Sequence, residues 1–117
     1  MFLMRLINQT KNTILAEDVF IANTPFERIK GLWGKKTFPS SQALILDPCN
    51  SVHTFFMCFA IDILFVDKND KVVGALSNFN PNRITRIYWQ ANRVIELPAG
   101  KLNLTNTQAQ DQLQLLD

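Results

Sequence analysis

The sequence is poor in the residue types that most often carry chemistry or covalent cross-links. Its 117 residues include two cysteines, one histidine and four glycines, and 19% of the residues are charged. No repeat, low-complexity segment or Gly-rich linker interrupts it, which fits one compact unit. Twelve basic residues against ten acidic ones leave a net charge of +2, too small to indicate a general binder of polyanions.

Long hydrophobic runs are also absent. Arg5 and Asn8 interrupt the first ten residues, which therefore lack the apolar stretch of a secretory signal. The longest central stretch free of Asp, Glu, Lys and Arg covers residues 48–61, whereas a membrane-spanning helix needs about 20 apolar residues. These absences predict a cytoplasmic protein without membrane contacts. In that compartment Cys49 and Cys58 are expected to be reduced thiols rather than a disulfide.

Apolar residues are abundant and arranged in short runs. They make up 47% of the chain, enough for residues 1–117 to fold as one domain without a metal or disulfide. Branched and aromatic residues between turn residues predict strands. The expected strands cover residues 2–7, 14–22, 43–46, 52–57, 61–66, 71–76, 93–97 and 112–115, with a short helix around 104–109.

One segment carries a clear helix start. Thr24 is a good N-cap, Pro25 suits the first helical position, and Glu27 completes a capping box. The helix is expected to end between Gly31 and Gly34. Spacings of three and four residues predict that it buries a set of apolar side chains, namely Phe26, Ile29, Leu32 and Trp33.

Four motifs follow one another along the chain: Glu27-Arg28 with Lys30-Gly31-Leu32, His53-Thr54-Phe55-Phe56-Met57, the run Ile61–Asp67, and Glu96-Leu97-Pro98-Ala99-Gly100. Together they resemble a known family, the domain of unknown function 192 (DUF192) proteins of bacteria and archaea. The resemblance implies an α+β, mainly β fold, with a small barrel-like antiparallel or mixed sheet and one helix after the first hairpin. It implies no established activity. The chain departs from the family pattern at two places. One is Trp33-Gly34, and the other is Gln110, because family members commonly have a glycine directly before the residue that corresponds to Asp111.

Four metal-ligand residue types lie within ten residues: Cys49, His53, Met57 and Cys58. On a helix three of them would share one face, but the Phe-rich context predicts a strand. Four strand residues span about 13 Å, and neighbouring side chains point to opposite faces, so one ion cannot bind all four. Neither a metal nor another cofactor is therefore expected. A metal- or thiol-dependent enzyme that uses Cys49 and His53 remains an alternative.

The single histidine lies on an otherwise aromatic and thioether-rich face. Strand alternation places His53 beside Phe55 and Met57, and a few polar atoms on an apolar wall are typical of a ligand pocket. Trp33 from the helix and Cys49 from the preceding turn are further candidate pocket residues. A structural, hydrogen-bonded histidine is the competing interpretation.

An acidic residue interrupts the most apolar run of the chain. Asp62 lies between Ile61 and Ile63, where an isolated buried carboxylate would be too costly to keep charged. Arg28 is the expected partner, with Glu96 competing for the same guanidinium group.

Basic residues gather in the second half of the chain. Arg83, Arg86 and Arg93 lie near Tyr88 and Trp89 in a stretch without acidic residues, a pattern found in single-strand nucleic-acid platforms. The small net charge favours solvated loop arginines, so nucleic acid is the weaker alternative. The sequence as a whole predicts a non-enzymatic domain that binds a small molecule or a protein partner near His53.

Overall fold

The computed structural model describes residues 4–117, which form two sheets and two short helices. In chain order the elements are β1 (Arg5–Asn8), β2 (Thr13–Ala16), β3 (Asp18–Ala22), α1 (Pro25–Lys30), β4 (Gln42–Leu46), β5 (Ile61–Val66), β6 (Val72–Phe79), β7 (Arg93–Pro98), α2 (Lys101–Thr105) and β8 (Leu113–Leu116). The predicted α+β, mainly β class is confirmed.

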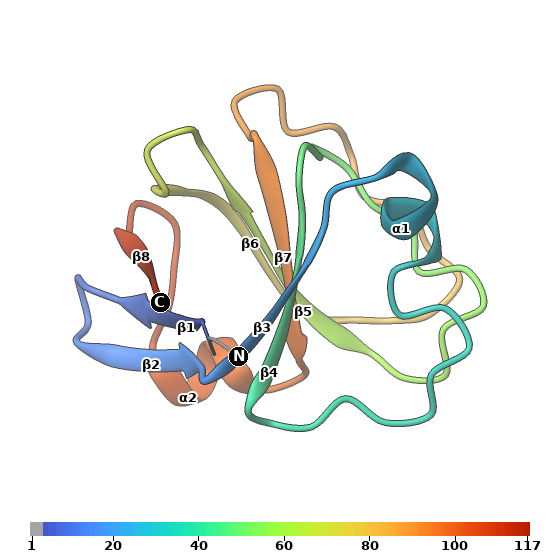
Figure 1. The fold of residues 1–117 in the computed structure, drawn as a ribbon, viewed down its shortest axis with the longest axis horizontal. Coiled ribbons are helices and arrows are strands. Elements are labelled where there is room, and N and C mark those ends of the chain that lie inside the picture. The colour runs from blue at the N-terminus through green and yellow to red at the C-terminus, as the bar shows by residue number, and fades with distance from the viewer. Residues whose placement is uncertain (1–3) are drawn as a thin grey trace.

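The larger sheet has the strand order β3-β4-β7-β5-β6, and the smaller one has the order β2-β1-β8. β3 and β4 run parallel, while the other pairs are antiparallel. Figure 1 shows the small sheet and α2 together at one end of the molecule and α1 at the other. The two sheets do not close into one barrel, so the barrel-like part of the expectation holds only loosely.

Two predicted strands differ from the structure, and the expectation for residues 2 and 3 lies outside the described residues. Residues 14–22 form two strands in different sheets, because the amides of Glu17 and Asp18 both donate to the carbonyl of Ser41 and turn the chain. Residues 52–57 form no strand beyond a bridge between His53 and Ile84. Phe56 has a φ of 64°, which a strand does not tolerate.

The predicted helix start is confirmed, but its predicted burial is wrong. The Thr24 hydroxyl accepts the Glu27 amide at 3.2 Å, and Gly31 ends the helix. No residue of α1 is buried: Phe26 is 73% and Ile29 61% exposed. The helix is only six residues long and lies at the edge of the molecule, so it presents no full apolar stripe to the sheet. Among the expected core residues only Leu32, just beyond the helix, is buried.

The centre of the larger sheet is buried on both faces, with all six residues of β5 inaccessible, whereas the edge strand β3 keeps exposed residues. One face packs against the small sheet and α2. This core includes Leu6, Leu15, Val19, Ile45, Leu64, Ile95, Leu97, Leu102 and Leu113. The other face packs against the loops around residues 49–60 and 85–92. That second core includes Leu32, Leu46, Val52, Met57, Ile61, Ile63, Phe65, Tyr88 and Val94.

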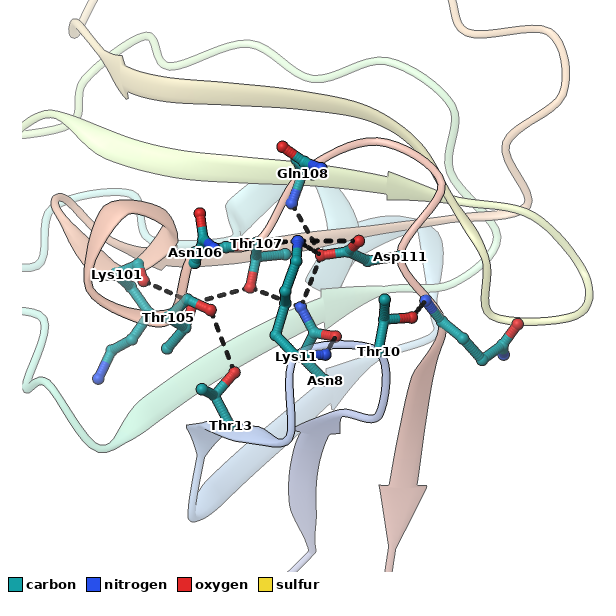
Figure 2. A network of polar contacts seen from close by, with 11 residues as sticks. Asn8, Thr10, Lys11, Thr13, Lys101, Thr105, Asn106, Thr107, Gln108 and Asp111 are labelled. Atoms are coloured by element: carbon teal, nitrogen blue, oxygen red, sulfur yellow. Dashed lines mark hydrogen bonds and ion pairs between the residues drawn. The ribbon is translucent and has the colours of Figure 1, made fainter.

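A buried polar network joins the first hairpin to the segment before β8 (Figure 2). The amide of Asn8, which is fully buried, donates to Thr107 and to the Asp111 carboxylate, each at 2.9 Å. Lys11 pairs with Asp111 at 3.0 Å, and the Gln108 backbone amide donates to the same carboxylate. Burial acts to raise the pKa of Asp111, but the hydrogen bonds from Asn8, Lys11 and Gln108 outweigh it and hold the pKa below its ordinary value. The network therefore fixes the C-terminal strand with an ionised carboxylate at its centre.

The expected helix near residues 104–109 starts earlier, as α2, and Asn106 in the left-handed region ends it. Gln110, one of the two departures from the family pattern, also has a left-handed backbone, with a φ of 80°. Its amide still donates to the Val72 carbonyl at 2.8 Å. Glutamine thus occupies a conformation that glycine adopts without strain.

We expect Gln110→Gly to stabilise the fold by about 1 kcal/mol, because the substitution removes the cost of a side chain at positive φ. Urea unfolding measures the effect. Gln108→Gly is the matched control, since Gln108 is not among the residues with positive φ. That variant should be neutral or destabilised, and equal effects of the two changes would contradict the assignment of strain to Gln110.

Candidate functional site

A cavity of about 230 Å³ lies between α1, residues 46–57 and β7. Its apolar wall includes Leu46, Val52 and Met57, all of which are buried. Five residues bring polar atoms to the same cavity. They are Arg28, Cys49, Ser51, His53 and Glu96.

Glu96 is the most unusual of these residues, since it lies on a central strand and is only 3% exposed. In the sheet register it stands between Leu44 and Ile63, on the face of the second core. No side-chain hydrogen bond formed within residues 4–117 involves the Glu96 carboxyl group, which lines the cavity. Because no buried side-chain oxygen among these residues lacks a partner, the carboxyl oxygens keep some accessibility from the cavity. Burial raises the pKa of Glu96 to about 8, so the carboxyl group is protonated at neutral pH.

Gly31 allows the chain after α1 to pass close to Glu96. A Cβ atom at this position would lie 3.7 Å from the Glu96 Oε1 atom, and the φ of Gly31 is 45°. A side chain here would be strained and would stand against the carboxyl group. Glycine at position 31 therefore allows the end of α1 to lie close to the Glu96 carboxyl group.

Asp62 does not pair with Arg28, so the predicted buried pair is wrong. The Asp62 carboxylate accepts the backbone amides of Asn78 at 2.8 Å and Leu102 at 2.9 Å. Asp62 stands opposite Leu97, whereas Glu96 stands opposite Ile63, and successive side chains of a strand point to opposite faces. The two acids therefore face different cores, and one arginine cannot serve both.

Arg28 lies on the Glu96 side of the sheet, where it lines the cavity. Its Nη1 atom donates to the Asn23 carbonyl at 3.2 Å. Neither of the two ion pairs among the described residues, Lys11–Asp111 and Arg93–Asp70, involves Arg28. The guanidinium group thus supplies positive charge to the cavity without neutralising a carboxylate.

Cys49 is half-buried, and its thiol donates to the Ser51 carbonyl at 3.0 Å. Burial raises the pKa of the Cys49 thiol, and the hydrogen bond to Ser51 and the charge of Arg28 offset this only in part. Once Glu96 is ionised at higher pH, its negative charge raises the pKa of the thiol further. A protonated thiol is a poor nucleophile. Cys58 is exposed and does not line the cavity.

The structure brings three of the five expected pocket residues to the cavity wall: Cys49, His53 and Met57. The exposed His53 ring stacks on Phe55 with centroids 5.2 Å apart, and its Nδ1 accepts the Phe55 amide at 3.3 Å. Phe55 thus lies behind His53 and does not line the cavity. Trp33 also lies outside it, packed against Phe56 at 5.0 Å.

Sequence reasoning assigned Glu96 to the wrong role and did not find Ser51, Val52 or Leu46. A signal for Glu96 was present, because an acid interrupts the apolar run of β7 just as Asp62 interrupts β5. No sequence signal marks the other three: Leu46 reaches the cavity from the end of β4, and Ser51 and Val52 reach it from the loop that follows. Within residues 4–117 no three His, Cys, Asp or Glu side chains are close enough to hold a metal ion.

Two of the three arginines that suggested an anionic partner are engaged locally. Arg93 pairs with Asp70, and the Arg86 guanidinium lies 3.8 Å above the Tyr88 ring. Tyr88 itself is buried against Phe65. Arg83 is exposed. Arg86, Arg93 and Tyr88 are therefore engaged within the chain, whereas Arg83 and Trp89, which is 81% exposed, remain open to solvent.

The profile of one family, DUF192, described as an "Uncharacterized ACR", matches residues 6–115. A UPF0127 protein of Thermococcus sibiricus is 32% identical over 112 residues, which cover 92% of this chain and 72% of that protein. A crystal structure of a protein of unknown function from Novosphingobium aromaticivorans superposes with a TM-score of 0.81 at 16% identity, covering 95% of this chain and 82% of the other.

A second crystal structure, from Sinorhizobium meliloti and named provisionally as a transcription regulator, has a TM-score of 0.82 at 19% identity. It covers 95% of this chain and 90% of that one. At this identity the two structures support the fold alone. Neither helix within residues 4–117 is long and apolar enough to cross a membrane.

We expect Asp62→Ala to lower the free energy of unfolding by about 3 kcal/mol, because it leaves the Asn78 and Leu102 amides without their acceptor. Arg28→Ala should lower it by less than about 1 kcal/mol, since the arginine has only a single exposed hydrogen bond. Urea midpoints of the two variants measure the difference. A larger loss for Arg28→Ala would show that the arginine does stabilise a buried charge.

The stability of the protein should fall as the pH rises from about 5 to about 8.5. The folded chain holds the Glu96 proton up to a pKa of about 8, whereas the unfolded chain releases it near 4.5. The contribution of Glu96 to stability is therefore fully present below the unfolded pKa and is lost as the pH rises to the folded one. The loss is on the order of a few kcal/mol, since a tenfold difference in proton affinity is worth about 1.4 kcal/mol.

The matched variant Glu96→Gln removes the titrating group with little change of shape. Its urea midpoint should vary much less over the same pH range and should exceed that of the wild type at pH 9. Parallel pH profiles for the two proteins would contradict a raised pKa at Glu96.

Proposed function

This chain belongs to the DUF192 family, and we propose that it binds a small molecule in the Glu96 cavity without converting it to a product. One observation carries the proposal. Glu96 is a buried acid on a rigid central strand, it has no hydrogen-bond donor among the described residues, and it faces a cavity. Buried polar groups are normally satisfied, so an open one on a cavity wall is suited to a ligand.

The cavity indicates the chemistry of the ligand. A protonated Glu96 both donates and accepts a hydrogen bond, so it suits an amide, an alcohol or a similar neutral polar group. Leu46, Val52 and Met57 would contact a small apolar part of the same molecule. His53 and Arg28 line the same cavity and add polar contacts for the rest of the ligand.

Binding is favoured over catalysis by the state of the nearest nucleophile. The Cys49 thiol has a raised pKa and donates to a backbone carbonyl, and His53 makes no hydrogen bond to it among the described contacts. A thiol enzyme needs a base within hydrogen-bond reach of the sulfur. For nucleic acid, the engaged Arg86 and Arg93 offer little support, and a likeness at 19% identity does not transfer a regulatory role.

A protein partner is the second candidate, and exposed aromatic residues near the cavity favour it. Phe26 is 73% exposed on α1, and Phe56 is 65% exposed next to Met57. Phe56 also has a positive φ, a costly conformation for an aromatic residue. These exposed aromatic residues, next in sequence to the lining residues Pro25 and Met57, could contact the protein that delivers or receives the ligand.

The test uses two neutral donor-bearing probes, butyramide and 1-butanol, and a donor-free molecule of similar size, methyl propyl ether. We expect at least one of the donor probes to bind at least fivefold more tightly than the ether, as measured by chemical-shift titration of the labelled protein. The largest shifts should fall on the amides near Glu96, Cys49 and Val52. Glu96→Leu replaces the acid with an apolar side chain like those already in the cavity wall. This variant should lose the preference for the donor probes over the ether.

His53→Ala tests whether the histidine serves the ligand or the fold. Because His53 is exposed, its removal should leave the urea midpoint nearly unchanged while weakening the binding of the preferred probe. A large loss of stability would identify His53 as structural. No preference for a donor probe over the ether in the wild type would contradict the proposed function.

A further inference from the structure

A second and larger hollow, of about 610 Å³, lies between β3–β4 and the segment that follows α1. We call it the lysine groove. Gly31 and Leu32 line both the groove and the Glu96 cavity, and otherwise the two linings differ. Its volume falls in the range of about 300 to 1,000 Å³ that is typical of small-molecule sites.

The floor of the lysine groove is apolar. Phe20 and Leu44 stand opposite each other in the parallel register of β3 and β4, and Phe38 faces them from the loop. Phe20 is 50% exposed although it lies within a strand, and β3 is the edge of the larger sheet. The groove therefore leaves aromatic and aliphatic surface open to solvent that a linear apolar chain could cover.

The lining of the groove is positively charged. Lys30, Lys35 and Lys36 line it with a single acid, Glu27. A Glu27 carboxylate oxygen accepts the Thr24 hydroxyl at 3.0 Å as part of the helix cap. Neither ion pair formed by residues 4–117 involves any of the three lysines. The groove thus carries uncompensated positive charge beside an apolar floor.

We propose that the lysine groove binds an anionic amphiphile as a single molecule, with a linear apolar tail on the Phe20–Leu44 floor and a carboxylate head at the lysines. Charge complementarity selects the head, because the head meets three lysines and one already engaged acid. The apolar floor selects the tail, since no buried polar side chain lines the groove to orient a polar molecule. This site is independent of the ligand proposed for the Glu96 cavity.

The experiment compares three amphiphiles with the same tail: dodecanoate, dodecanol and dodecyltrimethylammonium. Isothermal titration, at concentrations below micelle formation, should give an affinity for dodecanoate at least tenfold higher than for the ammonium compound, with dodecanol between them. Lys35→Glu combined with Lys36→Glu should reverse the order of the two charged probes. Phe20→Ser should weaken all three to a similar degree, because it removes part of the floor and none of the charge.

Two controls separate this site from general effects. Lys68→Glu combined with Lys71→Glu makes the same change of net charge at exposed lysines on the β5–β6 turn, and it should leave the preference for dodecanoate intact. Glu96→Leu should also leave dodecanoate binding unchanged, so failure of the cavity proposal and failure of this one remain distinguishable.

The outcomes that overturn the proposal are specific. Equal affinities for dodecanoate and dodecyltrimethylammonium would exclude recognition of the head by the lysines. A hexaglutamate peptide that competes as well as dodecanoate would assign the groove to acidic peptides. Co-sedimentation with phosphatidylglycerol vesicles, without binding of free dodecanoate, would assign it to a lipid surface. Absence of dodecanoate binding at millimolar concentration would also overturn it.

Discussion

The arrangement of this molecule depends on a central sheet that is buried on both faces. β5 has no exposed residue, and β7 beside it is buried at four consecutive positions. A strand with two buried faces normally carries only apolar side chains, because a charged group on either face loses its hydration. Each of these two strands nevertheless carries one acid, and the fold treats the two acids in opposite ways.

Asp62 is satisfied by the backbone. The start of α2 and the end of β6 bring the Leu102 and Asn78 amides to its carboxylate, so the acid joins elements that are far apart in the sequence. In the same way, the hydrogen bonds and the ion pair of Asn8, Lys11 and Asp111 join the small sheet to the segment before β8. In both places a buried polar group is fully satisfied and therefore fixes one arrangement of the chain.

Glu96 is not satisfied, and the surroundings of this residue contain the unusual features of the chain. Its side of the sheet is covered by the short helix α1 and by irregular loops rather than by a second sheet. That cover leaves a cavity and allows Phe56 to adopt a strained backbone. It also leaves the lysine groove next to α1. Irregular cover on a rigid sheet is where binding sites commonly lie. The two proposed sites therefore share one physical origin.

The sequence by itself determined the class of fold, most of the strands, the start and end of α1, and the positions that interrupt apolar runs. These features depend on neighbouring residues: alternation, the Thr24–Glu27 cap and the turn residues act within a few positions. Tertiary structure alone decided which way Asp62 and Glu96 face, that residues 52–57 form a loop, and that Phe26 and Ile29 remain exposed. The face on which a strand residue lies follows from its pairing with other strands, and the cover over Glu96 includes Arg28 and Cys49, which are more than forty residues away in the sequence. Local residue patterns contain no information about such contacts. The surroundings of Asp62 and Glu96 were therefore decided by how the strands of the sheet pair.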